Sequence, residues 1–467
     1  MPQNFLACDR EQSLLLPPDL RDWLPPDHLA WFVIETAKEL DLGAFFADYR
    51  ADGHGRAAHD PEMMVAVLLY AYATGARSAR EIERKCTEDV AYRVIAANQG
   101  PDHSTVARFR DRHQDALAEL FGQVLGLCGR AGIVSGETLA LDSTKIAANA
   151  SGQVNRSYRQ IAEEILADAA RIDAEEDELY GDSRGDELPA ELRDPARRRE
   201  WIKRELERAK KLERGGPNER AQRLAEAKRR LEAEHAARLQ AEADHAAWRK
   251  AREAELASKG QKMRGRPVVK EPLGPEPEGR VNTTDLDSRP VKTHRGFIQG
   301  YNAQAVATKE QVIVSCDLTQ SSVDGGQLTP MIDAARANLE AIGASAPKTV
   351  LADAGYWAKT QIKGLEKRGI EALIPPEGHA RTKPPTKGKR SGPYAQMREK
   401  LRSDRGSDLY RQRQTIIEPV FAHTKVIRGA DRFQRRGLAA CRAEWRLIAA
   451  THNLLKLWRA TPAPATG

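Results

Sequence analysis

Cysteines, aromatic residues and long hydrophobic runs are all scarce in this 467-residue sequence. Its five cysteines form no CxxC pair, which argues against a disulfide framework or a zinc knuckle and favours a reducing cytoplasm. The longest apolar run, residues 63–73, is too short to span a bilayer. The N-terminus also lacks the basic-then-apolar order of a secretory signal. These absences leave a charged, helix-rich protein that we expect to be cytoplasmic, with no membrane partner.

The positive charge of the chain is concentrated in one segment. Residues 379–436 carry 16 Lys and Arg against 5 Asp and Glu, a local balance of +11, whereas the whole chain carries +7. The rest of the chain is therefore slightly acidic. A run of charge is usually a solvated face, but this one surrounds a carboxylate, Glu418. That arrangement favours a polyanion as the partner of the segment.

Residues 1–130 are predicted to form a helical N-terminal domain. The segment NQGPD breaks the helical pattern, and Ser104 is expected to cap a helix that begins at Thr105. A short turn followed by a helix bearing Thr105, Arg108 and Arg112 is similar to the reading unit of a helix-turn-helix DNA-binding domain. An ordinary helix bundle with surface arginines explains the pattern equally well.

The middle of the chain changes character twice. Residues 138–141 are a short apolar run, interpreted as a buried strand that ends at Asp142, within a first core segment over 131–157. Residues 158–280 are then predicted to be a charged helical insert with a Pro/Gly-rich linker. A solvated helical arm or a coiled-coil segment is the simplest explanation of this insert, and we assign it no chemistry.

An α/β pattern resumes over residues 281–460, before a short tail at 461–467. Four strands are expected at 297–307, 311–318, 349–352 and 370–374, and helices at 327–339, 409–425 and 443–459. Together with the strand at 138–141, this order predicts a ribonuclease-H-like α/β core, a mixed sheet with flanking helices, interrupted by the insert after its first strand.

Three carboxylates have local reasons to converge. Asp142 and Asp353 follow expected strands, where backbone rigidity can hold a short side chain in place, and Glu418 can reach the same point from a helix. Hard carboxylate oxygens suit Mg²⁺, and a pair of such ions supports phosphodiester cleavage. Three further acids lie in expected loops and either assist the site or play no part in it: Asp285, Asp287 and Asp324.

Several motifs resemble the DDE transposases of bacterial insertion sequences, in the branch with a Tyr-Arg-Glu-Lys signature. Tyr410, Arg413, Glu418 and Lys425 match this signature, with one residue more between Arg413 and Glu418 than in the usual form, so Arg411 is an alternative. The other matches are PDHSTVARFRDRH, LDSTKIAANAS, TDLDSR, GFIQGYNAQ, ADAGYW and AEWRLIAATHNLLKLW.

The resemblance implies a function and a set of roles. Asp142, Asp353 and Glu418 would be the catalytic residues and would bind two Mg²⁺ ions, with Mn²⁺ as a substitute. Lys425 and Arg413 would hold phosphates of the transposon ends, and Tyr410 would pack on backbone or on a displaced base. The enzyme would bind terminal inverted repeats and join the ends to double-stranded target DNA. It would act as a homodimer or higher multimer, associated with the bacterial nucleoid when bound.

Three other functions remain open from the residues. A transposase that has lost catalysis would bind DNA as a repressor of its own element, although all three acids are present here. A nuclease of the same fold would cleave DNA without strand transfer. A structural protein would depend on the helices at 158–259.

Overall fold

The computed structural model describes residues 19–49, 57–180, 203, 217–262, 273–293, 295–377 and 391–461. Residues 379–390 of the basic segment and most of the predicted linker therefore lie outside the described residues. The chain divides into two compact units. The first comprises Met1–Asn149 and Val291–Gly467, and the second comprises Ala150–Pro290.

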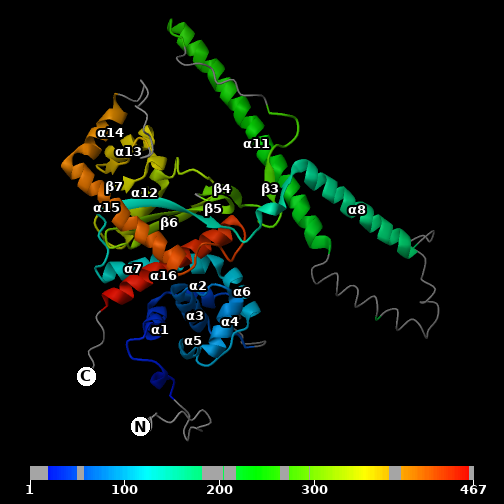
Figure 1. The fold of residues 1–467 in the computed structure, drawn as a ribbon, viewed down its shortest axis with the longest axis vertical. Helices are drawn as coiled ribbons and strands as arrows, with labels where there is room; N and C mark the ends of the chain where they lie inside the picture. Colours follow the sequence, from blue (N-terminus) through cyan, green and yellow to red (C-terminus); the bar gives the residue numbers. More distant parts are fainter. Residues whose placement is uncertain are drawn as a thin grey trace, which may run out of the picture. The chain divides into compact units, whose positions relative to one another are not determined.

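Short helices build the N-terminal region of the first unit (Figure 1). In chain order they are η1 Leu20–Trp23, α1 Leu29–Glu39, α2 Gly43–Phe46, α3 Pro61–Thr74, α4 Ala79–Glu88, α5 Val90–Ile95, α6 His103–Arg112 and α7 Gln114–Arg130. Helix α3 begins where Asp60 accepts a hydrogen bond from the Glu62 amide and Pro61 occupies the first turn. It is apolar on all sides and almost entirely buried, as expected for a helix at the centre of a bundle.

The start of α6 differs from the prediction. The helix begins at His103, and its N-cap is Asp102, whose Oδ1 accepts a hydrogen bond from the Thr105 amide at 2.7 Å. Ser104 lies inside the first turn and donates its hydroxyl to the same carboxylate oxygen at 2.6 Å. Asp102 is the better cap because its carboxylate satisfies both donors. The predicted Ser104 cap is therefore wrong by two residues.

A mixed six-stranded sheet forms the rest of the first unit. Its strands are β1 Thr138–Ala147, β4 Arg289–Thr293, β5 Gly296–Thr308, β6 Ile313–Thr319, β7 Thr349–Ala352 and β8 Glu371–Leu373. The order is β4-β5-β1-β7-β8, and β6 also pairs with β5. Strand β1 is antiparallel to β5 and parallel to β7. The predicted strands all exist, whereas β4 was not predicted.

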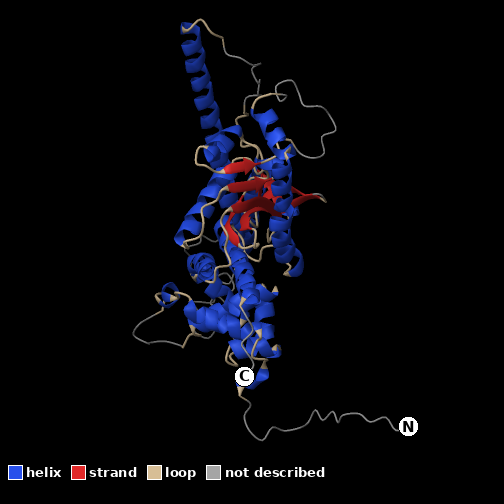
Figure 2. Ribbon diagram, turned by 90° about the vertical axis from the view of Figure 1, so that its left-hand side faces the viewer, coloured by secondary structure: helices blue, strands red, loops and turns tan. Residues whose placement is uncertain are grey.

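Helices flank this sheet (Figure 2). They are α12 Leu328–Ala341, α13 Lys359–Glu366, α14 Pro393–Arg402, α15 Asp404–Phe421 and α16 Leu438–Ala460, with a 3-10 turn η3 at Ala354–Tyr356. The predicted helix over 409–425 is not α-helical throughout, because it becomes a π-helix, η5, over Ala422–Ile427. Helix α15 packs against β1, β5 and β7, and so it lies over the strands that carry the predicted acids.

Helix α16 joins the N-terminal helices to the sheet. It packs against α3 and α7 as well as β6, and its residues are buried along most of its length. Trp445 is fully buried and donates its indole N–H to the Gln304 carbonyl of β5 at 3.0 Å. The N-terminal helices and the sheet thus share one core, in agreement with the single compact unit.

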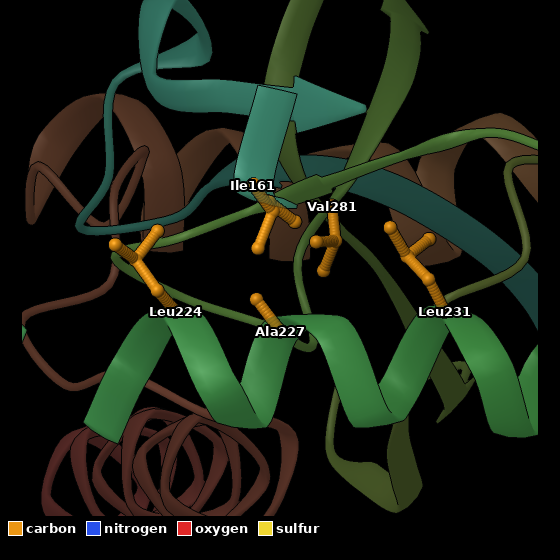
Figure 3. Packing of buried hydrophobic residues seen from close by; sticks show 5 residues of the cluster. All are labelled: Ile161, Leu224, Ala227, Leu231 and Val281. Atoms are coloured by element: carbon orange, nitrogen blue, oxygen red, sulfur yellow. The ribbon is translucent and has the colours of Figure 1, made fainter. Parts of the chain in front are cut away.

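The second unit is a helical arm with a small β-ribbon. Helices α8 Tyr158–Tyr180 and α11 Pro217–Ser258 accompany a short turn, η2 Gly152–Val154, and the antiparallel pair β2 Asn155–Ser157 and β3 Arg280–Asn282. Leu224, Ala227 and Leu231 lie on one face of α11 and pack against Ile161 and Val281 (Figure 3). The spacing of three and four residues is that of an amphipathic helix. No helix in the described part of the chain is long and apolar enough to cross a membrane.

Candidate active site

Asp142 and Asp353 lie on neighbouring parallel strands. The register pairs Leu141 of β1 with Ala352 of β7, so the two aspartates follow at the same level of the sheet. Asp142 was predicted to end its strand, but β1 continues to Ala147. The strand continues because β5 provides antiparallel partners for the whole segment from Leu139 to Ala147. The juxtaposition of the two acids does not depend on that error.

Arg413 connects the third predicted acid to the first. From α15, its Nη1 donates to Asp142 Oδ2 at 2.7 Å, and its Nη2 lies 3.7 Å from Glu418 Oε1. The Arg413 side chain is 13% exposed, whereas that of Glu418 is 56% exposed. Arg411, the alternative, is exposed and pairs with Asp408. Arg413 is therefore the arginine of α15 that faces the acids.

Burial and crowding of negative charge perturb these carboxylates. Burial, helped by the charge of Asp353, raises the pKa of Asp142 to about 6, although a hydrogen bond from the Ser143 amide and the charge of Arg413 act in the opposite direction. Burial also raises the pKa of Asp353, with a contribution from the charge of Asp324. Burial is thus the main reason why the ionised forms of Asp142 and Asp353 are disfavoured, and carboxyls with perturbed pKa values are frequent at functional sites.

Asp324 is one of three acids that the sequence left undecided, and it lies near Asp353. It accepts hydrogen bonds from Asn302 Nδ2 at 2.8 Å and Gln304 Nε2 at 2.9 Å, and it lies 3.7 Å from Lys145 Nζ. Burial opposes ionisation of Asp324, but these partners and Ser143 lower its pKa overall. Asp285 and Asp287 belong to the second unit, where Asp287 pairs with Arg230.

Gly355 allows the carboxylates of Asp353 and Asp324 to lie close together. A Cβ added at this glycine would lie 3.0 Å from Asp353 Oδ1 and 3.2 Å from Asp324 Oδ2. The Gly355 amide also donates to Asp353 Oδ1 at 2.9 Å. A side chain at this position would push the carboxylates apart, so the glycine of ADAGYW has a structural reason.

Side chains of the site alternate along β1. Asp142 faces Arg413, whereas Ser143 and Lys145 face Asp324, as the two-residue period of a strand requires. Asn302 and Gln304 are two residues apart on buried β5 and point toward Asp324. Two polar residues at that spacing in a buried strand were the signal that could have identified Asp324 as a member of the site.

Lys425 and Tyr410 lie on either side of Glu418 in sequence. Lys425 contacts strand β1, and Tyr410 lies beside Arg413. Lys425 Nζ donates to Thr144 Oγ1 at 3.0 Å and to the Lys145 carbonyl at 2.9 Å. Lys425 belongs to the π-helix, so the predicted α-helix over 409–425 does not extend to this lysine. Tyr410 is half-buried, and Arg413 lies 6.0 Å from the centre of its ring. Burial raises the pKa of Tyr410.

Pro419 fixes the backbone beside Glu418. A proline inside a helix cannot donate to the carbonyl four residues earlier, which here belongs to Thr415. Gln311 Nε2 donates to that oxygen at 2.9 Å. The helix that carries Glu418 is therefore bonded to the turn between β5 and β6 at the point where Pro419 interrupts its backbone hydrogen bonds.

The predicted DNA-reading residues lie on α6, apart from the carboxylates. Arg108 is exposed and, among the described residues, donates only to Ser104 in its own helix turn. Thr105 is half-buried. Arg112 pairs with Asp48 at 3.5 Å and stacks over Tyr49. The structure therefore leaves Arg108 more available than Arg112, and it does not bring these residues together with Asp142.

The donor set at the sheet fits Mg²⁺, which prefers hard oxygen ligands. Asp142 and Asp353 supply adjacent carboxylates, and Arg413 already brings one cationic group between Asp142 and Glu418. Within the residues that the structure describes, no three His, Cys, Asp or Glu side chains form a closed metal-binding group. The three predicted acids therefore share a neighbourhood, with Glu418 linked to Asp142 through Arg413.

Comparison with known proteins gives two family matches. Residues 18–112 match the Transposase domain (DUF772), and residues 280–454 match the Transposase DDE domain. No curated protein and no solved structure matches the chain. The DDE domain implies a ribonuclease-H-like fold, with which the mixed sheet and its flanking helices agree. Asp353 and Glu418 fall inside the second matched segment, and Asp142 precedes it. The two matches support a DDE transposase family for this chain.

Proposed function

We propose that this chain is a metal-dependent transposase that binds the terminal inverted repeats of an insertion sequence, cleaves DNA there and joins the freed 3′ ends to target DNA. The observation that carries the proposal is the pair of acids on parallel strands, Asp142 and Asp353, with Glu418 linked to Asp142 through Arg413. This arrangement supports two successive reactions at one site, hydrolysis and transesterification.

Asp142, Asp353 and Glu418 would hold two Mg²⁺ ions, or Mn²⁺ in their place. When bound, such ions activate a water or a 3′-hydroxyl and stabilise the leaving oxygen. The strands fix the two aspartates, and the exposed Glu418 closes the site from α15. Arg413 then exchanges a carboxylate for a DNA phosphate, for which its planar guanidinium is equally suited.

Three further groups serve the DNA substrate in this proposal. Lys425 offers a cation at the second half of β1, next to Thr144. Tyr410 presents an aromatic ring beside Arg413, on which sugar-phosphate backbone or an unpaired base can pack. Helix α6 would read the duplex through Arg108, with Thr105 and Arg112 beside it. Pairing of two ends would require a homodimer or a higher multimer, and a bound enzyme would be associated with the bacterial nucleoid.

The test is an assay of strand cleavage and strand transfer on a duplex that carries the end of the element. Wild-type protein is expected to cleave only with Mg²⁺ or Mn²⁺ and to join the 3′ end to a second duplex. Asp142→Asn, Asp353→Asn and Glu418→Gln are expected to bind the duplex but to lose both products. Asp333→Asn is the matched control, because Asp333 is an exposed acid on α12 paired with Arg368.

Each alternative function gives a different outcome. Cleavage without strand transfer would identify a nuclease of the same fold. Binding without cleavage by wild type would identify a repressor. Equal cleavage by wild type and Asp142→Asn would refute the assigned site.

A further inference from the structure

Basic side chains from residues 413–436 meet strand β1 in chain order. Arg413 contacts Asp142, and twelve residues later Lys425 contacts Thr144 and the carbonyl of Lys145. The two segments therefore run in the same direction, side by side. The cationic side chains of residues 413–436 that contact β1 therefore lie in a row along this strand.

The chain after the π-helix extends this row by pairing with the end of β1. The Ala147 amide donates to the Asp431 carbonyl at 2.9 Å, and the Phe433 amide donates to the Ala147 carbonyl at 2.8 Å. These bonds form a parallel bridge between Ala147 and Arg432. Residues 431–433 thus act as a minimal additional strand beside β1.

Two arginines from this loop are held at consecutive carbonyls beyond β1. Arg432 Nη1 donates to the Ala148 carbonyl at 3.0 Å, and Arg436 Nε donates to the Asn149 carbonyl at 3.0 Å. Both side chains belong to exposed residues. A guanidinium has five N–H donors, and each of these two gives one to the backbone. The remaining donors are available to a partner at the surface.

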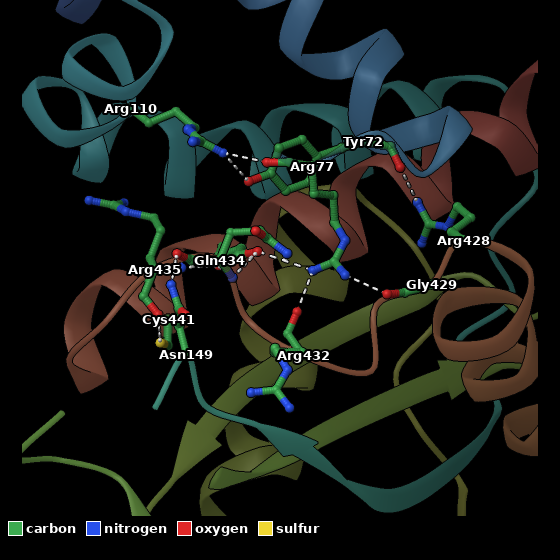
Figure 4. Close-up of polar contacts among 11 residues, drawn as sticks. Tyr72, Arg77, Arg110, Asn149, Arg428, Gly429, Arg432, Gln434, Arg435 and Cys441 are labelled. Atoms are coloured by element: carbon green, nitrogen blue, oxygen red, sulfur yellow. Dashed lines mark hydrogen bonds and ion pairs between the residues drawn. The ribbon is translucent and has the colours of Figure 1, made fainter. Parts of the chain in front are cut away.

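A buried carboxylate fixes the loop in this position, and Figure 4 labels its loop residues Arg432, Gln434 and Arg435. Glu444 of α16 accepts from the Gln434 amide at 3.1 and 3.0 Å and from the Arg435 amide at 3.1 Å. Arg77 Nη1 lies 3.2 Å from the same carboxylate and also donates to the Arg432 carbonyl at 2.7 Å. Arg432 is therefore anchored through its backbone as well as its side chain, and Arg436 directly follows the backbone that Glu444 fixes at Arg435.

The loop also contacts the predicted reading helix. Arg435 Nη2 donates to Asp111 Oδ1 of α6 at 2.9 Å and to Gln114 Oε1 at 3.0 Å. A hollow of about 410 Å³ lies between them, lined by Ala107 of α6, Arg435 and Arg436 among others. Arg435 is occupied by these partners and acts as a support. The surface from α6 to Arg436 is continuous.

We propose that Arg432 and Arg436 bind the phosphate backbone of the DNA end, at a distance from the reacting bond set by strand β1. Ala148 lies six positions after Asp142, a span of about 20 Å at roughly 3.3 Å per residue. A duplex lying along the strand would cover that span in about six base pairs at ~3.4 Å each. Double-stranded DNA is the partner with evenly spaced anionic groups over such a length. The inference rests on the proposed function.

The test measures the salt dependence of DNA binding by fluorescence anisotropy. The slope of log K against log [salt] is negative. The double variant Arg432→Gln/Arg436→Gln is expected to reduce its magnitude by about 1.8, since each lost phosphate contact contributes about 0.9. A double substitution of both arginines by Lys should restore the wild-type slope. Arg368→Gln is the control, because Arg368 is a surface arginine of the same unit paired with Asp333.

Duplex length gives the second measurement. End duplexes that retain four base pairs on the side of the Arg pair should bind wild type and the Gln variant equally, whereas those with twelve should distinguish them. An unchanged slope in a Gln variant that melts like wild type would overturn the inference. Failure of wild type to bind any end duplex would overturn the proposed function first, and loss of the slope only in Arg108→Gln would overturn this inference alone.

Discussion

Asp142 and Glu444 are acids of the first unit that each lie beside an arginine, and they differ in their other neighbours. Glu444 is fully buried and receives two backbone amides and Arg77. Asp142 receives Arg413 and one backbone amide, and Asp353 lies next to it. Burial raises the pKa of both carboxyls, but only at Asp142 does a neighbouring acid raise it further. The partners of Glu444 thus suit a residue that stabilises the fold. Asp142, in contrast, is expected to reduce the stability of the fold when ionised, as functional groups often do.

The largest expected effect is on Glu444. Glu444→Ala should lower the free energy of unfolding by about 3–5 kcal/mol, because Arg77 would remain buried without its carboxylate. Guanidinium denaturation followed by circular dichroism measures this loss. Glu340→Ala, at an exposed position of α12, is the control. A loss below about 1 kcal/mol, as for an ordinary surface ion pair, would contradict a structural role for Glu444.

Asp142 should respond in the opposite direction. Asp142→Asn is expected to stabilise the metal-free protein at pH 8 by about 1–3 kcal/mol, because a pKa of about 6 in the folded state makes the ionised form costly. The folded protein takes up a proton first as the pH falls. The advantage of Asn should therefore shrink below pH 6 and disappear below the ordinary carboxyl pKa. Equal unfolding free energies at pH 8 would contradict the assignment of strain to this acid.

A substitution at Gly355 tests whether Asp353 and Asp324 must lie close together. Gly355→Ala should weaken Mg²⁺-dependent cleavage by about 10–100-fold, the usual cost of disturbing groups that orient metal ligands. The physical reason is the contact of the added Cβ with Asp353 and Asp324. Gly364→Ala is the control, since a Cβ there meets nothing within 4 Å. Comparable cleavage by both variants would mean that the close approach is unimportant.

The smallest expected effect is on Arg411, and it distinguishes the two candidates for the arginine of the signature. Arg411→Gln should change stability by less than about 0.5 kcal/mol, as expected for an exposed ion pair. Arg413→Gln should cost about 1.5–3 kcal/mol at pH 8, because Asp142 loses a charged hydrogen bond. Thermal unfolding at fixed pH compares them. A larger loss in Arg411→Gln would reverse the assignment.

The parts of the fold with a strong local pattern could be predicted from sequence. The strand at 349–352 is an apolar run that ends at an acid, and β7 has those bounds. The full length of β1 was missed because its second half, STKIA, is partly polar and is held by partners on β5, which local periodicity does not reveal. Likewise, the π-helix after Phe421 depends on distant contacts, since Arg428 at its end donates to Tyr72 and Thr451.

The candidate site followed the same rule. Asp353 and Asp142 were predicted as site residues because each follows an apolar run. Asp324 remained undecided because its importance comes from Asn302 and Gln304, which reach it across the sheet. The contact between Arg413 and Asp142 joins residues 271 positions apart. Spacing within the signature therefore left the choice between Arg411 and Arg413 open.

Binding of Mn²⁺ to the isolated protein, measured by calorimetry with electron paramagnetic resonance, tests the central claim most directly. Wild type should bind Mn²⁺, Asp142→Asn and Asp353→Asn should each lose that binding, and Glu444→Gln should retain it if it folds. Asp333→Asn serves as the surface control. Unchanged Mn²⁺ binding in both aspartate variants would contradict the account, because these two carboxylates would then not be the metal ligands.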